Sequence, residues 1–214
     1  MDYLMNSAGL GVPCIREFET SSAADIVKGT VMTLSDGKAV KASDSSTVLG
    51  ILAEDYKTAK DELNPRSGSG RVKIIISPGM ICRQKLQQMT VDEKGTATSV
   101  KAAGIIVPTG SNAFVGGYVK LVGKADNSEN TDSIGKTRKI TASSGVTLTI
   151  EEGGIPCVGD VYAILPPVGY ANMALSSDGT KYAFSTTKST IAQVVSCLPE
   201  NDYTEIAFVK TFFH

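Results

Sequence analysis

Short apolar segments rich in β-branched residues recur along this chain, and glycine-containing turns separate them. Residues 146–150 (VTLTI) alternate apolar and polar side chains, which is the period of a strand with one buried face. Residues 35–38 (SDGK) supply a tight turn in which the glycine can adopt a positive φ. The other predicted strands are residues 27–34, 39–42, 47–53, 71–76, 118–122, 161–165, 181–184, 191–195 and 205–209. This pattern predicts an all-β fold, a compact β-barrel or sandwich of short antiparallel strands.

A single segment fits a helix. Residues 54–63 would form about two and a half turns before the Asn-Pro pair at 64–65 ends them. The same residues also suit a long loop, because the glycine- and serine-rich stretch 66–70 follows directly. We therefore expect few or no helices.

The two ends of the chain carry similar patterns. The matched pairs are 27–31 with 158–161, 35–38 with 177–180, 47–52 with 190–195, and 72–76 with 206–209. We expect a β-rich body over residues 26–214, made of two similar β units, 26–83 and 157–214, that share one core. Residues 84–156 would be a β-rich segment inserted between these units.

Residues 1–25 lack sustained periodicity and are rich in small and turn-forming residues. We interpret them as an N-terminal extended arm that is ordered only where another surface holds it, and that is dispensable for folding. An unattached terminus is the alternative. The apolar residues of this arm that would bind a partner are Leu4, Val12, Ile15 and Phe18.

The charge balance limits the classes of partner. With 214 residues, the chain is long enough to bury a core, and its 21 Lys and Arg residues against 22 Asp and Glu residues give a formal net charge of −1. Nucleic-acid-binding proteins normally carry a basic excess. No apolar run approaches the roughly 18 residues of a membrane-spanning helix, and no signal-peptide pattern opens the sequence. We expect neither nucleic acid nor membrane as a partner.

Catalytic chemistry is poorly represented in the chain. His214 is the single histidine, and histidine is the commonest general base and metal ligand. Cys14, Cys82, Cys157 and Cys197 are far apart and form no CxxC pair. Cys82 and Cys197 lie in apolar runs and are interpreted as buried free thiols, with a disulfide left open as the alternative. We expect no catalytic residue, no metal and no cofactor, and a protein that is not an enzyme.

Two polar segments are candidate binding sites. Residues 126–132 (DNSENTD) space their side-chain oxygens as a calcium-binding loop does, but Thr131 replaces the central glycine and Thr137 the bidentate glutamate. A solvated polar loop is the better interpretation. Residues 136–139 (KTRK) are basic but short, and we interpret them as a solvated turn.

The first half of the chain resembles a known family. The segments concerned are 27–34 (VKGTVMTL), 35–40 (SDGKAV), 47–53 (TVLGILA) and 71–76 (RVKIII). Their order, a strand, a glycine turn and two further strands, resembles the small β-barrel decoration proteins of tailed-phage capsids, of the lambda head-decoration type. Residues 158–161 and 190–195 look like the second half of that pattern. The resemblance covers about half of the chain.

This resemblance implies a homotrimer on the outer surface of a virion, with the arm pairing with the major capsid protein. Such a structural protein would be present in the host cytoplasm during assembly and would stabilise a shell pressurised by DNA. It needs a rigid body, an arm able to add a strand to a sheet edge, and no catalytic residues. Two other classes stay open, a β-sandwich surface, adhesion or carbohydrate-binding module and a histidine-independent hydrolase. Aromatic residues are only 6% of the chain, without tryptophan, and no carboxylate pair is evident.

Overall fold

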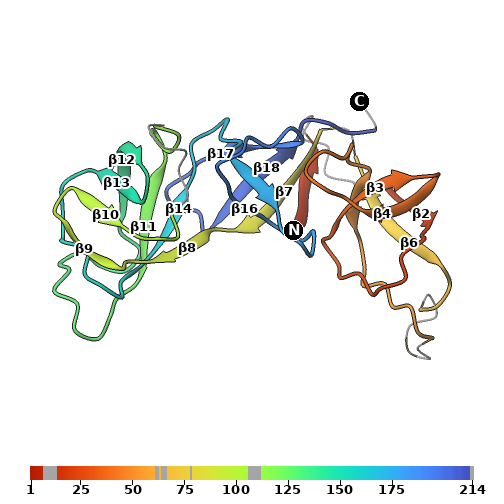
Figure 1. Cartoon of the computed structure of the whole chain (residues 1–214), viewed down its shortest axis with the longest axis horizontal. Coiled ribbons are helices and arrows are strands. Elements are labelled where there is room, and N and C mark those ends of the chain that lie inside the picture. Colours follow the sequence, from red (N-terminus) through yellow and green to blue (C-terminus); the bar gives the residue numbers. More distant parts are fainter. Residues whose placement is uncertain (7–13, 61–62, 64–66, 78, 106–111, 213–214) are drawn as a thin grey trace.

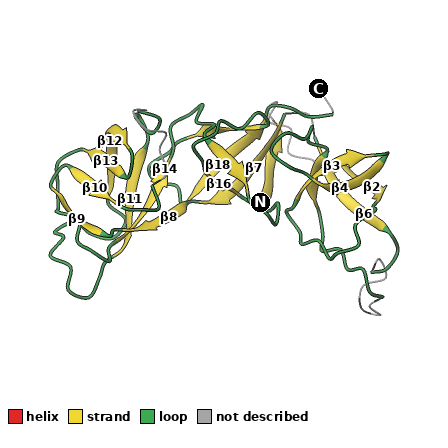
Figure 2. Ribbon diagram, viewed as in Figure 1, coloured by secondary structure: helices red, strands yellow, loops and turns green. Residues whose placement is uncertain are grey.

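The computed structural model describes residues 1–6, 14–60, 63, 67–77, 79–105 and 112–212. These residues form strands and loops without a helix, so the predicted all-β class is confirmed (Figure 2). Residues 54–60 are bends with one isolated β-bridge, between Tyr56 and Ile26, and the loop alternative holds for them. No helix in the described part of the chain is long and apolar enough to cross a membrane.

Three β-sheets lie in a row along the long axis of the molecule (Figure 1). The N-terminal sheet has the order β2-β6-β5-β3-β4, and none of its strand pairs is parallel. Its strands are β2 (Cys14–Glu19), β3 (Val31–Ser35), β4 (Lys38–Lys41), β5 (Gly50–Leu52) and β6 (Arg71–Ile76). Asp36 and Gly37 have positive φ angles of 51° and 76°, which is the turn geometry that joins β3 and β4 by two residues. The sheet curls, and its two edges approach where Thr20, directly after β2, bridges Ala39 of β4.

The central sheet has the order β1-β7-β18-β17. Its strands are β1 (Asp2–Asn6), β7 (Met80–Lys85), β17 (Ala192–Ser196) and β18 (Tyr203–Phe208). A separate hairpin of β15 (Met173–Leu175) and β16 (Tyr182–Phe184) is fastened to β7 by the amide of Gln84. That amide accepts from the N–H of Tyr182 and donates to its carbonyl, both at 2.8 Å.

Residues near the C-terminal end of the described chain return to the N-terminal sheet. The N–H of Val48 donates to the carbonyl of Lys210 at 2.9 Å, and the N–H of Phe212 donates to the carbonyl of Val48 at 3.0 Å. The carboxylate of Asp44 accepts from the N–H of Leu175 at 2.6 Å. The loop between β4 and β5 therefore joins the N-terminal sheet to residues distant in sequence.

The distal sheet has the order β8-β14-β11-β12-β13-β10-β9. Its strands are β8 (Gln87–Thr90), β9 (Glu93–Thr96), β10 (Ser99–Lys101), β11 (Tyr118–Gly123), β12 (Thr137–Ser144), β13 (Thr147–Ile150) and β14 (Val161–Leu165). Its two end strands, β8 and β9, are consecutive in the chain and separated by Val91 and Asp92 alone. The sheet therefore curls strongly enough for one stretch of chain to supply both of its ends.

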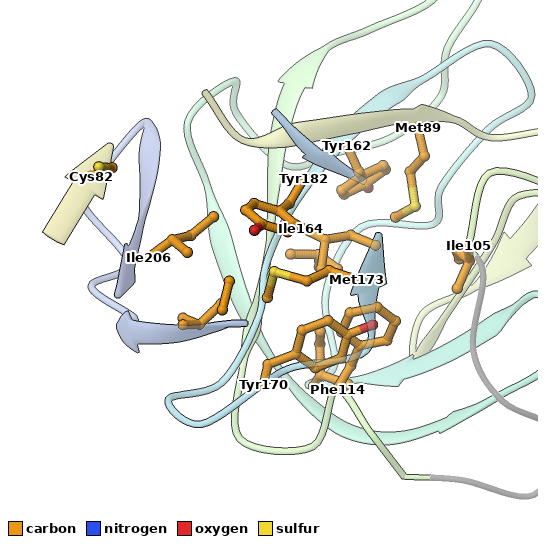
Figure 3. Close-up of a cluster of buried hydrophobic side chains, with 14 of the residues drawn as sticks. Cys82, Met89, Ile105, Phe114, Tyr162, Ile164, Tyr170, Met173, Tyr182 and Ile206 are labelled. Carbon is orange, nitrogen blue, oxygen red and sulfur yellow. The ribbon is translucent and has the colours of Figure 1, made fainter. Parts of the chain in front are cut away.

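The two largest hydrophobic clusters follow from the period-two pattern of the strands. The larger one extends through all three sheets, from Val31 through Ile206 to Ile164. Figure 3 shows the part of it between Ile206 and Ile164. The smaller one, with Met32 and Ile74 at its centre, lies on the other face of the N-terminal sheet. Because Val31 and Met32 are neighbours that enter different clusters, this sheet is buried on both faces.

The sheets divide the chain differently from the predicted units. Strand β14 lies between β8 and β11, so residues 157–214 and residues 84–156 build the distal sheet together. The predicted boundary between residues 83 and 84 falls inside β7. Of the two sets of matched segments, only the N-terminal set belongs to a single sheet. This set consists of residues 27–31, 35–38, 47–52 and 72–76.

Gly50 in β5 offers a test of the close contact between β5 and β6. A Cβ there would overlap the carbonyl oxygen of Ile75 and lie 2.8 Å from Cγ2 of Ile74. We expect Gly50→Ala to lower the free energy of unfolding by about 1–3 kcal/mol, measured by urea denaturation. Gly123→Ala is the matched control, because a Cβ at Gly123 would make ordinary contacts of 3.6 and 3.8 Å with Val161. Equal losses in both variants would contradict this packing.

Candidate functional site

Strands β1 and β2 belong to the segment that the sequence assigns to a partner-binding arm. Strand β1 pairs antiparallel with β7 of the central sheet, and β2 pairs antiparallel with β6 of the N-terminal sheet. Each is the end strand of its sheet. The described parts of the arm are therefore edge strands of the body itself.

The structure does not bring together the predicted contact residues that it describes. Leu4 lies in β1, and Val12 lies outside the described residues. Ile15 and Phe18 lie on opposite faces of β2. Phe18 packs against the smaller hydrophobic cluster, whereas the side chain of Ile15 is 52% exposed. Ile15 is therefore the apolar residue of β2 that a partner can reach.

A buried arginine pins three loops at one end of the distal sheet. Arg138 in β12 is only 3% exposed, and its Nη2 pairs with the carboxylate of Asp132. The same Nη2 donates to the carbonyl of Gly154 at 2.8 Å, while Nη1 donates to the carbonyl of Ala97 at 3.3 Å. Burial lowers the pKa of Arg138, which reflects the cost of enclosing a cation. One side chain thus links the β9–β10 turn, the loop before β12 and the loop after β13.

A second buried group, the Asp160 carboxylate, holds two of these loops, the loop before β12 and the loop after β13. It accepts from the N–H of Ala125 at 3.1 Å, the N–H of Cys157 at 3.1 Å and the side-chain amide of Asn130 at 3.0 Å. That amide also donates to the hydroxyl of Tyr162 at 2.8 Å. Asp160 and Asn130 are 0% and 3% exposed. We call Asp132, Arg138, Asn130, Asp160 and Tyr162 the polar network.

The polar network corrects two interpretations of the sequence. The segment 126–132 is not a uniformly solvated loop, because Asn130 is buried and the side chain of Asp132 is 11% exposed. The segment 136–139 is not a solvated turn, because residues from Thr137 onward form β12 and Arg138 points inward. Among the described residues, no three His, Cys, Asp or Glu side chains are grouped to hold a metal ion.

The signal for this network was present in the sequence but not decisive. Arg138 is two positions before the apolar Ile140, so both side chains occupy the same face of a strand. An arginine on a buried face needs a counter-charge, yet the sequence alone does not say which of the acidic residues supplies it. Its partners at 97, 132 and 154 come from three different loops.

Most aromatic rings are buried or half-buried, and two of the four thiols are buried in the interior of the protein. The four cysteines are free, and burial raises the pKa of the Cys82 thiol to about 12, which confirms the buried thiol expected there. Cys197 is half-buried, and Cys14 is exposed on β2. Phe212 is the only exposed aromatic side chain among the described residues. The described surface therefore offers little for stacking a sugar ring.

A surface hollow of about 430 Å³ lies beside β17. Its lining residues are Ala171, Lys188, Ser189, Thr190, Ala192, Gln193 and Val209. The lining contains one charged side chain, Lys188, and no carboxylate. This hollow therefore does not supply the acid/base pair that a histidine-independent hydrolase would need.

Comparisons with known proteins give no relative for this chain. No protein-family model matches it, no curated protein matches it, and no solved structure matches it.

Low pH should weaken the hydrogen bonds through which the Asp160 carboxylate holds the loops. Burial by itself would raise the pKa of this carboxyl, but hydrogen bonds from Asn130, Cys157, Ser128 and Ala125 outweigh it and hold the pKa below its ordinary value. A carboxyl with a depressed folded-state pKa stabilises the fold above its unfolded pKa and loses that contribution as the pH falls through the folded value.

We therefore expect the free energy of unfolding to decrease as the pH is lowered from 5 towards 3, measured by urea denaturation at each pH. Asp160→Asn should show a flatter decrease over this range, because the titrating group is gone. Asp126→Asn, on the exposed part of the neighbouring loop, is the control and should keep the wild-type profile. Identical profiles for Asp160→Asn and wild type would contradict the expectation.

Proposed function

We propose that this chain is a structural virion protein that binds the outer surface of a tailed-phage capsid and stabilises the shell as a decoration protein. Its partners would be the major capsid protein and two further copies of itself in a homotrimer. No catalytic step is part of the proposal.

The observation that carries the proposal is the place of the four segments that resemble decoration proteins. Residues 27–34, 35–40, 47–53 and 71–76 supply β3, β4, β5 and β6, which are adjacent in the curled N-terminal sheet. The resemblance therefore covers one spatial unit of the fold rather than scattered fragments. The later matches, 158–161 and 190–195, contribute to the distal and central sheets and do not build a second such unit.

The edge of the same unit suits attachment to a shell. Strand β2 ends the N-terminal sheet and presents the 52% exposed side chain of Ile15. A sheet edge offers backbone groups that fix the register of an added strand, and an exposed apolar side chain supplies the burial that favours binding. Subunits bound across the junctions of a shell resist its expansion without any chemical step.

The test is cosedimentation of the purified chain with empty shells assembled from the major capsid protein of the same phage. The wild-type chain should cosediment, and Ile15→Lys should raise the Kd about 10- to 100-fold, because full burial of such a side chain contributes about 1.5–3 kcal/mol. Val27→Lys is the matched control, since Val27 is 50% exposed but lies outside β2. Absence of wild-type binding would refute the proposal, and equal losses in both variants would remove Ile15 from it.

A further inference from the structure

Strands β1 and β2 complete two different sheets, although they are successive in the chain. Their pairing partners β7 and β6 are also successive, so the two pairs run from the N-terminal sheet into the central sheet (Figure 1). We call β1 and β2 together the strap. Each strand of the strap is added at an edge, and removing it would leave the strand order of the remaining sheet unchanged.

Strand β2, the longer strand of the strap, is attached mainly by its backbone, whereas Met1 and Tyr3 at the β1 end also pack against the larger hydrophobic cluster. Strand β2 keeps one register with β6 over six residue pairs, from Cys14 opposite Ile76 to Glu19 opposite Arg71. Five of its six side chains are exposed, and only Phe18 is half-buried. Little apolar surface would therefore be lost if β2 left its place, whereas its hydrogen-bonding positions would need a new partner.

Strand β6, the pairing partner of β2, would be an exposed apolar edge if β2 left it. Strand β6 (RVKIII) is rich in β-branched residues, and Val72, Ile74 and Ile76 are buried on one of its faces. An apolar edge of this kind is a template for pairing with another chain. The segment that pairs with it in register over six residues is β2 itself, and a second copy of this chain carries the same segment.

The connection between the strap and the body allows such an exchange. Residues 21–25 follow β2 with small or exposed side chains, and Ile26 is the first residue after them that is buried in the body. The carboxylate of Asp25 is fixed to the N–H and hydroxyl of Thr58, so the body end of the connection is anchored. The four residues before Asp25 can extend over about 13–14 Å.

From these observations we infer that copies of this chain associate by exchanging the strap: β1 and β2 of one copy complete the central and N-terminal sheets of a second copy. The occupant of the edge is then a second copy of the same strand, and every pair of the register is retained. If each copy gives its strap to the next copy, the copies form a closed ring, and their number is set by the angle between neighbours. Such an assembly needs no interface other than the strand pairings already present in one copy. This inference does not depend on a capsid.

The test uses the pair Glu17 and Lys73, which face each other across β2 and β6. The N–H of Thr20 donates to the carbonyl of Gly70, so by alternation Glu17 and Lys73 form a non-hydrogen-bonded pair, whose short Cα separation suits a disulfide. All variants carry Cys14→Ser, which removes the exposed thiol on β2. The double variant Glu17→Cys/Lys73→Cys reports the register, and its monomer should form the disulfide within one chain.

Exchange is then read from a mixture of the two single variants. Glu17→Cys chains and Lys73→Cys chains are refolded together and oxidised, and the oligomer fraction is analysed by peptide mass mapping. A mixed disulfide between positions 17 and 73 is expected, because only a strap lying on the β6 of another copy brings these thiols together. Each single variant oxidised alone controls for random cross-links. Oligomers without the mixed disulfide, a protein that stays monomeric, or a double variant without its internal disulfide would each overturn the inference.

Discussion

Replacing Arg138 with methionine should lower the free energy of unfolding by about 3–5 kcal/mol, because it leaves the Asp132 carboxylate buried without its counter-charge. Methionine has a similar length and keeps much of the packing, so the loss reports the charge rather than a cavity. The carbonyls of Ala97 and Gly154 lose their donor in the same variant. The measurement is urea denaturation at neutral pH.

The control for this variant is Lys139→Met on the same strand. Lys139 directly follows Arg138 and is exposed, so its replacement should change the free energy of unfolding by no more than about 0.5 kcal/mol. Amide hydrogen exchange should also become faster in the three pinned loops of Arg138→Met than in the N-terminal sheet. A loss no larger than that of the control would mean that the polar network does not hold the loops.

The second large effect is expected at Phe114, which is fully buried where three segments meet. Its ring stacks on Tyr170 with centroids 4.8 Å apart (Figure 3). It also meets the ring of Phe184 in β16 edge-on, with centroids 5.0 Å apart. Phe114→Ala should lower the free energy of unfolding by about 3–5 kcal/mol, since it removes this burial and leaves a cavity.

Thermal and urea unfolding of Phe114→Ala should be compared with Val115→Ala. Val115 is the next residue and is 40% exposed, so its truncation should cost far less. Because the three aromatic residues come from the segment before β11, the loop after β14 and β16, the loss should appear as one cooperative shift. A separate early transition would show that these segments unfold independently.

The sequence predicted those strands whose own residues are mostly apolar and β-branched. Residues 71–76 and 161–165 are strands with the predicted bounds, because β-branched and apolar residues fill them. Strands β8 (QQMT) and β9 (EKGT) were not predicted, since their composition is polar. They are strands because β14 and β10 provide pairing partners, which are distant along the chain for β8.

The candidate sites were less accessible to sequence reasoning than the fold. The sequence pattern predicts a solvated basic turn around Arg138. Its burial is explained only by its contacts with three loops that come together in the fold. The predicted contacts of Leu4, Val12, Ile15 and Phe18 with a partner stay predictions. The sequence did not indicate that the described parts of the arm occupy edges of their own body. For β1 the reason is that its partner, β7, is not evident in the sequence pattern.

The hydrogen bonds between Val48 and residues 210 and 212 have a consequence for synthesis on the ribosome. Residues 14–76 carry every strand of the N-terminal sheet, yet the loop that holds Val48 meets its partners at 210 and 212 only after roughly 135 further residues have been made. At 5–20 residues per second this interval is on the order of 7–27 s. During that time the face of the N-terminal sheet that will enter the larger hydrophobic cluster lacks the members of that cluster that β17 and β18 supply, so this apolar face is a site of aggregation on the nascent chain.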